Sequence, residues 1–271
     1  MTAKVGEREA EDALDDRSFV TALARGLDVL RCFRPNETTL TNQDIAARTR
    51  LPKPTVTRLT YTLRRLGYLE HSERTGTYRL GAGVLSLGYG VLAGMEIGER
   101  AQAEMRRLCE DGPNPHVTAA LGEMHRLSVV YMAVHRAPQT VTLTMNVGAR
   151  LPLFRSAIGR AILAAMRPAE RCHLIEHAKA EAHGRADDVD ADVASALEGF
   201  ARDGYCTSFG EWRPEVNGIA VPVISLDGDR IYGLNVGGPS FLVSPECLHD
   251  EYAARLKAAA AALSQPAEGS R

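Results

Sequence analysis

Two short stretches of the sequence hold side chains whose types and spacing could do chemistry. The first, "HLIEH", places His173 and His177 four residues apart, so that on a helix both imidazoles share one face and can bind zinc, with Glu176 as a base. The second, from Lys53 to Arg65, presents hydroxyl groups, lysine and arginine between apolar residues. Such groups bind the phosphates and base edges of nucleic acid.

The zinc interpretation of "HLIEH" finds little support elsewhere in the sequence. A zinc hydrolase needs a third ligand downstream in an enzyme fold, and the motif alternates with apolar residues as an ordinary surface helix does. Cys206 is no better as a nucleophile, because nothing places a base and an acid beside it. A metal-dependent hydrolase with a DNA-binding appendage is the alternative hypothesis. We expect no metal site, no cofactor and no enzymatic activity.

The segment "LPKPTVTRLTYTLRRLGYLE" predicts a helix with two different faces. At 100° per residue its apolar face is formed by Val56, Leu59, Leu63 and Leu66. The residues expected to bind DNA, from this helix and the hairpin after it, are Lys53, Pro54, Thr55, Thr57, Arg58, Tyr61, Thr62 and Arg74. Arg58 suits a bidentate contact to guanine or a phosphate, while Lys53 and Thr55 lie at the helix N-terminus, which favours phosphate oxygens.

The elements around this helix predict a winged helix-turn-helix. An amphipathic helix is expected over 19–33, with its apolar stripe formed by Val20, Leu23, Leu27, Leu30 and Phe33. Thr41 or Asn42 can cap a short second helix, and Gly67 ends the third. The residues "YLEHSERTGTYRL" then predict two strands around a turn at Thr75-Gly76.

The charge distribution fits one DNA-binding module within a larger protein. Residues 18–80 hold eleven Lys and Arg against five Asp and Glu, whereas the whole 271-residue chain has a formal net charge of −2. Residues 1–18 are acidic with almost no apolar side chains, which predicts a disordered tail rather than a signal peptide. Five scattered cysteines and no apolar run long enough for a membrane span predict a cytoplasmic protein.

The remainder of the chain predicts a linker helix and then an α+β domain. Residues 81–98 are rich in glycine yet apolar, which suits a helix buried against a second subunit. After a helix over 99–110, strands are expected at 116–121, 127–135, 140–146, 218–225 and 230–237, with helices at 156–166, 168–180, 193–203 and 244–263. A mainly antiparallel sheet flanked by helices is an α+β fold.

From Phe19 onward the sequence resembles the isocitrate-lyase-regulator (IclR) family of bacterial transcription factors. The stretches that carry the resemblance include "ALARGLDVLRCF", "GARLPLFRSAIGRAILA", "DGYCTSFGEWRPEVNGIAVPV" and "GLNVGGP". The resemblance implies a winged helix-turn-helix over 19–80, a linker and dimerisation helix over 81–98, and a GAF-like effector-binding domain over 99–265. It also implies a homodimer or a dimer of dimers (a homotetramer) on palindromic promoter DNA.

The resemblance further implies a small-molecule effector, often an organic acid, on the sheet of the second domain. The family's pocket positions fall on Ala157, Ile158, Ser208, Gly218, Asn235 and Gly237. The residue types add two more: Arg155 could bind a carboxylate as a charged fork, and Trp212 could cover a ring. The expectation is a ligand-responsive transcriptional regulator of a neighbouring catabolic operon, which senses a small, aromatic carboxylate.

Overall fold

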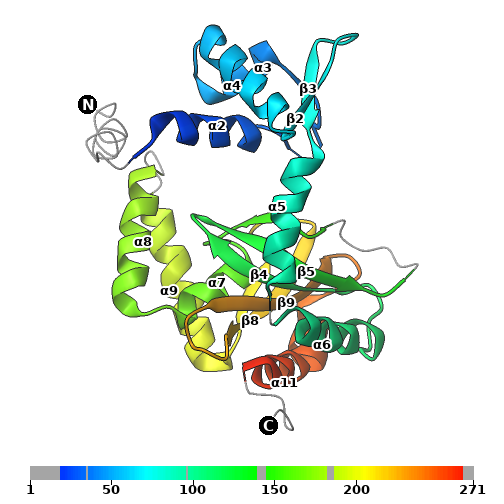
Figure 1. Cartoon of the computed structure of the whole chain (residues 1–271). Helices are drawn as coiled ribbons and strands as arrows, with labels where there is room; N and C mark the ends of the chain where they lie inside the picture. The colour runs from blue at the N-terminus through cyan, green and yellow to red at the C-terminus, as the bar shows by residue number, and fades with distance from the viewer. Residues whose placement is uncertain (1–18, 35, 96, 139–144, 182–185, 265–271) are drawn as a thin grey trace. The chain divides into compact units, whose positions relative to one another are not determined.

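The computed structural model describes residues 19–34, 36–95, 97–138, 145–181 and 186–264. The chain divides into two compact units, Met1–Met95 and Glu96–Arg271 (Figure 1). The tail expected over residues 1–18 and most of the strand expected over 140–146 lie outside the described residues. Within the described part of the chain, no helix is long and apolar enough to span a membrane.

The first unit is the predicted winged helix-turn-helix followed by one long helix. Its elements are α2 (Thr21–Arg31), β1 (Leu40–Thr41), α3 (Asn42–Thr49), α4 (Lys53–Arg65), β2 (Leu69–Ser72), β3 (Thr77–Leu80) and α5 (Ala82–Ala93). The hairpin forms as expected, and the short strand β1, which the sequence did not reveal, pairs with β3 to give the antiparallel order β1-β3-β2.

Local sequence signals fix the ends of these elements. Thr41 caps α3 through a capping box, in which its side chain accepts from the Asp44 N–H and the Asp44 carboxylate accepts from the Thr41 N–H. Arg50 then adopts a left-handed conformation (φ 55°), which turns the chain toward α4. Gly67 (φ 78°) and Gly76 (φ 64°) supply the same backbone region after α4 and in the hairpin turn.

The core of the first unit corrects two expectations about apolar faces. Its buried side chains are Val29, Leu40, Ile45, Val56, Leu63 and Leu69. Leu66, expected inside, is 62% exposed, because α4 has ended and Leu69 of β2 is buried in the core instead. The stripe of α2 is likewise exposed at Val20, Leu23 and Leu27, since only the C-terminal end of α2 packs on this core, around Val29.

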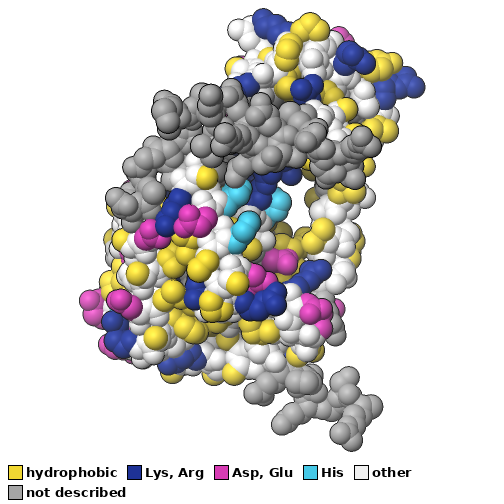
Figure 2. Space-filling model, turned by 90° about the vertical axis from the view of Figure 1, so that its left-hand side faces the viewer, with side chains coloured by type: hydrophobic (Ala, Val, Ile, Leu, Met, Phe, Trp, Pro, Cys, Tyr) yellow, Lys and Arg dark blue, Asp and Glu magenta, His cyan; other side chains and the backbone are white. Residues whose placement is uncertain are grey.

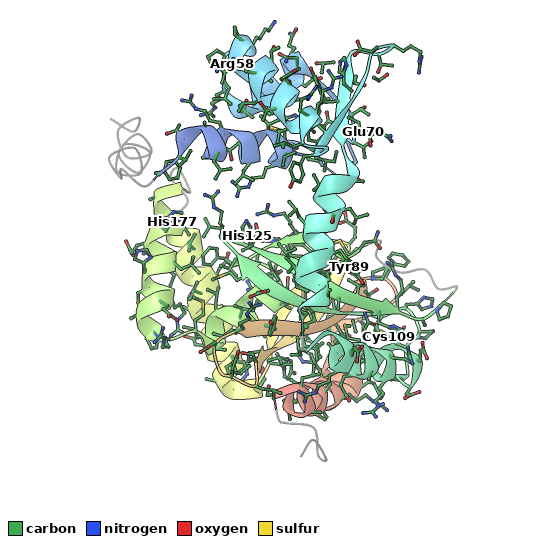
Figure 3. The ribbon with its side chains drawn as sticks, in the orientation of Figure 1. Arg58, Glu70, Tyr89, Cys109, His125 and His177 are labelled. Carbon is green, nitrogen blue, oxygen red and sulfur yellow. The ribbon has the colours of Figure 1, made fainter. Side chains whose placement is uncertain are left out.

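Helix α5 begins in close contact with the turn after α4. The Gly81 N–H donates to the Tyr68 carbonyl at 2.9 Å, and the Gly83 N–H donates to the Gly67 carbonyl at 3.2 Å. A Cβ atom at Gly81 would lie only 2.5 Å from the Gly67 oxygen, so this approach requires glycine. Farther along, α5 exposes its apolar side chains, among them Tyr89, labelled in Figure 3, and Leu85.

The second unit confirms the α+β prediction. Six strands, β4 (Thr118–His125), β5 (Ser128–Arg136), β6 (Arg150–Pro152), β7 (Cys206–Phe209), β8 (Val216–Ile224) and β9 (Ile231–Pro239), form an antiparallel sheet of order β6-β5-β4-β9-β8-β7. The helices are α6 (Gly98–Glu110), α7 (Ala157–Ala165), α8 (Pro168–Glu181), α9 (Ala186–Asp203), α10 (Pro245–Cys247), a π-helix (Leu248–Tyr252) and α11 (Ala253–Ser264).

Alternation along the strands assigns these helices to the two faces of the sheet (Figure 1). Ala120 and Ala220 pack in one cluster with α7, whereas their buried neighbours in the strands point to the opposite face, which α6 and α11 cover. Gly233 permits the close approach of α7, because a Cβ there would lie 2.4 Å from the Ile158 side chain.

The first hairpin of this sheet is tighter than the sequence indicated. The turn expected over Gly122 to Arg126 is instead made around Arg126, which adopts φ 54°. Gly122 remains within β4 at a register shift, where a Cβ would lie 2.7 Å from the Val129 side chain and 3.0 Å from that of Ile158. This glycine therefore serves helix packing and not the turn.

Candidate nucleic-acid interface and ligand cavity

Helix α4 separates a buried back from an exposed polar front. Val56, Thr60 and Leu63 are buried, and Thr60 satisfies its hydroxyl by donating to the Thr57 carbonyl at 3.1 Å. Of the residues expected to bind DNA, the structure exposes Lys53, Pro54, Thr57, Arg58, Tyr61 and Thr62, and half-buries Thr55. Such a division leaves the polar front of α4 free to enter a DNA groove.

Two hydroxyl groups of this front, those of Thr57 and Thr62, are hydrogen-bonded within the described part of the protein, whereas the charged groups of Lys53 and Arg58 are not. Thr57 Oγ1 donates to the Lys53 carbonyl at 3.0 Å and accepts from Asn42 at 3.2 Å, which connects α3 to α4. Thr62 Oγ1 donates to the Arg58 carbonyl at 3.0 Å. The charged groups of Lys53 and Arg58 make no hydrogen bond or ion pair with any described residue, and Arg58 projects from the surface (Figure 3).

The two arginines of the hairpin differ in whether an acidic side chain pairs with their charge. Arg79 of β3 lies opposite Glu70 of β2, and its Nε donates to that carboxylate at 2.9 Å. Arg74 lies in the exposed turn between the strands and has no partner among the described residues. The positive charge available at the tip of the wing is therefore that of Arg74.

A cavity of about 40 Å³ lies in the second unit between the N-terminal end of α7 and the sheet. Its lining is formed by Thr118, Tyr131, Met145, Leu151, Ser156, Ala157, Ile158, Ser208, Trp212, Val216, Asn217, Gly218, Asn235 and Gly237. Seven of the eight residues expected to bind an effector belong to this lining, all except Arg155. Among the described residues, none with a charged side chain lines the cavity.

Helix α7 begins at the cavity and brings backbone N–H groups to it. Ser156 is the N-cap: its hydroxyl donates to the Pro152 carbonyl at 2.6 Å and accepts from the Gly159 N–H at 3.2 Å. Ala157 and Ile158 follow in the first turn, where backbone N–H groups lack acceptors within the helix, and both line the cavity. The start of a helix in this position favours an anionic group.

The polar side chains of the sheet that line the cavity are those of Thr118, Tyr131, Ser208, Asn217 and Asn235, of which the sequence indicated Ser208 and Asn235. Thr118 of β4 and Tyr131 of β5 are 5% and 4% exposed. Burial raises the pKa of the Tyr131 phenol to about 12, against a smaller lowering by the Asn235 side chain, so the phenol stays neutral. Thr118 Oγ1 and Asn235 Oδ1 are buried without a hydrogen-bond partner among the described residues.

Backbone of two neighbouring strands forms part of the cavity wall, because glycine occupies two paired positions. Gly218 of β8 lies opposite Gly237 of β9. A Cβ at Gly237 would lie 2.5 Å from the Asn217 carbonyl oxygen, so that position accepts only glycine without rearrangement. A Cβ at Gly218 would make a contact of 3.4 Å, which the backbone tolerates.

The expected role of Arg155 needs correction. Its side chain is exposed and lies outside the cavity lining, and only its backbone carbonyl takes part, by accepting from Ser208 Oγ at 2.7 Å. The buried guanidinium is that of Arg160, which donates to the Phe154 and Thr207 carbonyls at 2.9 and 2.8 Å. It also forms ion pairs with two carboxylates and is not available to a ligand.

Trp212 lies at the edge of the cavity, as expected. It is half-buried, and the guanidinium of the neighbouring Arg213 stacks on its ring at 4.6 Å from the centroid. The indole therefore has one partner outside the cavity, which favours a fixed ring position.

The "HLIEH" motif lies on α8, away from the cavity lining. Its glutamate, Glu176, forms an ion pair with Lys179 at 3.2 Å, and His173 is exposed. Histidine side chains do gather on the face of the second unit seen in Figure 2. Nevertheless, the described residues include no group of three or more His, Cys, Asp or Glu side chains placed to hold a metal ion.

Family models match both units of the chain. The model of the IclR helix-turn-helix domain matches residues 22–73, and that of the bacterial transcriptional regulator IclR C-terminal domain matches residues 89–265. The chain belongs to the IclR family. It is thus a DNA-binding, ligand-responsive transcriptional regulator and not an enzyme.

Individual IclR-family proteins resemble the chain over most of its length. An IclR-family regulator from Brucella abortus has 42% identity and a TM-score of 0.82, covering 92% of this chain and 93% of its own. The regulator TsaQ1/TsaQ2 of Comamonas testosteroni is 33% identical over 82% of this chain and 79% of its own. An IclR homologue from Microbacterium hydrocarbonoxydans, complexed with 4-hydroxybenzoate, has 25% identity and a TM-score of 0.67, covering 90% of this chain and 97% of its own.

Proposed function

We propose that this IclR-family regulator binds a palindromic promoter in the cytoplasm and is switched by a small carboxylate held in the cavity beside α7. In this proposal residues 19–80 bind DNA, residues 81–98 form a linker and dimerisation helix, and residues 99–265 bind the effector. The genes it controls are those of a nearby catabolic operon.

The observation that carries the ligand proposal is the start of α7 at the wall of the cavity. The N–H groups of Ala157 and Ile158 offer an anion the positive end of a helix, and no carboxylate side chain lines the cavity to repel it. The 4-hydroxybenzoate complex of the Microbacterium homologue supports a carboxylate as ligand, because it shows one bound to a protein of this family.

The size of the cavity limits the ligand. A volume of about 40 Å³ is well below the roughly 150 Å³ at which an apolar cavity holds a benzene ring. A short aliphatic acid fits the lining as it stands, whereas an aromatic acid requires a lining side chain such as Met145 or Trp212 to move. Such a movement is one way for a ligand to favour one protein conformation over another, which regulation requires.

The DNA part of the proposal depends on the free cationic groups of α4 and the wing. Lys53, Arg58 and Arg74 form one exposed set without partners among the described residues, on the elements that a winged helix-turn-helix brings to DNA. The exposed apolar side chains of α5 support assembly into a dimer, because a monomer rarely exposes so many together.

One experiment tests both halves together. Fluorescence anisotropy of the full chain on DNA from its own upstream region, with and without a panel of short aliphatic and aromatic acids, should show tight binding that at least one acid alters. A Gly218→Val variant, which places a side chain in the cavity at a position where the backbone tolerates a Cβ, should keep DNA binding and lose the response to the acid. If no acid changes DNA binding while an amine or a sugar does, the carboxylate proposal is wrong.

A further inference from the structure

We propose that the effector is a hydroxy acid with one carboxylate, whose hydroxyl group donates to Asn235 Oδ1 and accepts from the Thr118 hydroxyl. This inference rests on the proposed function, because it assigns chemistry to the second end of the ligand whose carboxylate lies at the start of α7. It is carried by the two buried polar atoms of the cavity that the described protein leaves without a partner.

Asn235 determines the donor requirement. Of the two ends of its amide, Oδ1 is buried without a hydrogen-bond partner among the described residues. The free end is a carbonyl oxygen, which only accepts. A ligand that satisfies it must therefore carry an O–H or N–H group.

Thr118 narrows the choice to a hydroxyl group. It lies on β4, next to β9 and on the same face as Asn235: the register pairs Thr118 with Gly237 and Ala120 with Asn235. The two free atoms are thus diagonal neighbours across the two strands. A ligand hydroxyl can donate to Asn235 and accept from Thr118 at once, whereas an oxo group can only accept.

Because no described acidic side chain lines the cavity, an ammonium group is excluded as the donor that the ligand presents to Asn235. A ligand ammonium group could donate to both atoms, but the lining holds no Asp or Glu to balance its charge. Burial of an unpaired cation is costly, and the start of α7 opposes it further. For the same reason a second carboxylate would find no cationic partner, because no Lys or Arg side chain lines the cavity.

Matched ligand pairs test the inference on the wild-type full chain. Calorimetry should compare lactate with propionate, and 4-hydroxybenzoate with benzoate, because each pair differs by one hydroxyl. In whichever pair binds, we expect the hydroxylated acid to bind at least tenfold more tightly, and pyruvate and alanine to bind no better than propionate. Equal affinity within the pair, or a preference for pyruvate or alanine, overturns the inference.

Two variants assign the effect to the named atoms. Thr118→Val keeps the shape and removes the free hydroxyl, so the hydroxyl preference should fall at least fivefold, without a lower melting temperature of the ligand-free protein. Thr207→Val is the control, because it removes a hydroxyl group from the neighbouring position of β7, which does not line the cavity; this variant should keep the preference. An unchanged preference in Thr118→Val contradicts the assignment.

The two levels of the proposal fail in different ways. Failure of every acid to bind the wild-type chain contradicts the proposed function itself. Binding of acids without regard to the hydroxyl leaves the proposed function intact and contradicts only this inference. If Thr118→Val does not fold, the affinity ratio of the wild-type chain decides alone.

Discussion

Arg160 of α7 forms a buried ion pair with Glu211, the residue that precedes Trp212 at the edge of the cavity. The same guanidinium lies 3.4 Å from the Asp192 carboxylate of α9 and donates to the Thr207 carbonyl of β7. One side chain therefore joins α7 to α9 and to the β7–β8 connection, and that connection includes Trp212 of the cavity lining.

Replacing Arg160 should destabilise the second unit strongly. Arg160→Met leaves two half-buried carbonyls and two partly exposed carboxylates without their donor, and removal of one partner of a buried ion pair costs about 3–5 kcal/mol. Because Glu211 and Asp192 are 39% and 26% exposed, we expect a loss near the lower end of that range in urea unfolding. Arg167→Met is the control: its pair with Glu170 is exposed to solvent, so its removal should leave the free energy of unfolding nearly unchanged. Equal losses would contradict this prediction.

The polar front of α4 should separate specific from general DNA binding. Arg58→Ala should weaken operator binding by about 1–3 kcal/mol if the guanidinium contacts a base, while Lys53→Ala should weaken binding to all sequences and reduce the salt slope by about one. Anisotropy titrations at several salt concentrations measure both effects. Arg79→Ala serves as the control, because Glu70 already pairs with that charge. Wild-type affinity in both test variants would show that this face of α4 does not bind the DNA.

The apolar side chains of α5 should hold two subunits together. Leu85 is 76% exposed and Leu92 is 36% exposed in the single chain, so replacing both with Glu should leave each unit folded. The charged pair cannot be buried against a second α5, so the dimer should dissociate and tight binding to a palindrome should be lost. Analytical ultracentrifugation measures the change, with Leu226→Glu in an exposed turn as the control. If the wild-type protein sediments as a monomer at micromolar concentration, the prediction is wrong.

Stability should fall in alkaline solution because of buried thiol and phenol groups. Burial raises the pKa of Cys206 from 9.0 to about 12, so between these values the unfolded chain loses a proton that the folded protein keeps. This thiol alone should lower the free energy of unfolding by about 1.4 kcal/mol per pH unit in that window. Urea unfolding of Cys206→Ala should show a shallower pH dependence by one proton. Cys172→Ala, at an exposed thiol, should match the wild type, and no difference between the variants would contradict the prediction.

Much of the DNA-binding unit could be predicted because local signals determine it. The cap at Thr41, the helical period of α4 and the turn at Gly76 all depend on neighbouring residues and appear in the structure as expected. Strand β1 could not be predicted, because a strand of two residues is too short to show an alternating pattern of apolar side chains. The helical period of α4 predicted that Leu66 is buried, but the period no longer applies at Leu66 because the helix ends at Arg65.

The ligand cavity was less accessible to sequence reasoning. Thr118 and Tyr131 lie in strands whose alternation indicates burial but not what a buried side chain meets. The choice between Arg155 and Arg160 depends on which side of α7 faces the β7–β8 connection, and tertiary packing alone determines that. Family resemblance supplied six of the lining positions and the residue type of Trp212 a seventh, but neither could reveal which polar atoms remain free.

The glycine contacts at the start of α5 have a mechanical consequence. Two backbone hydrogen bonds join Gly81 and Gly83 to the turn that ends α4, and no side chain separates the two segments. The connection between α4 and α5 therefore resists twisting about the α5 axis. A twist applied to α5 from its far end reorients α4 instead of being absorbed between them, so the angle at which Arg58 meets a groove follows the rotation of α5.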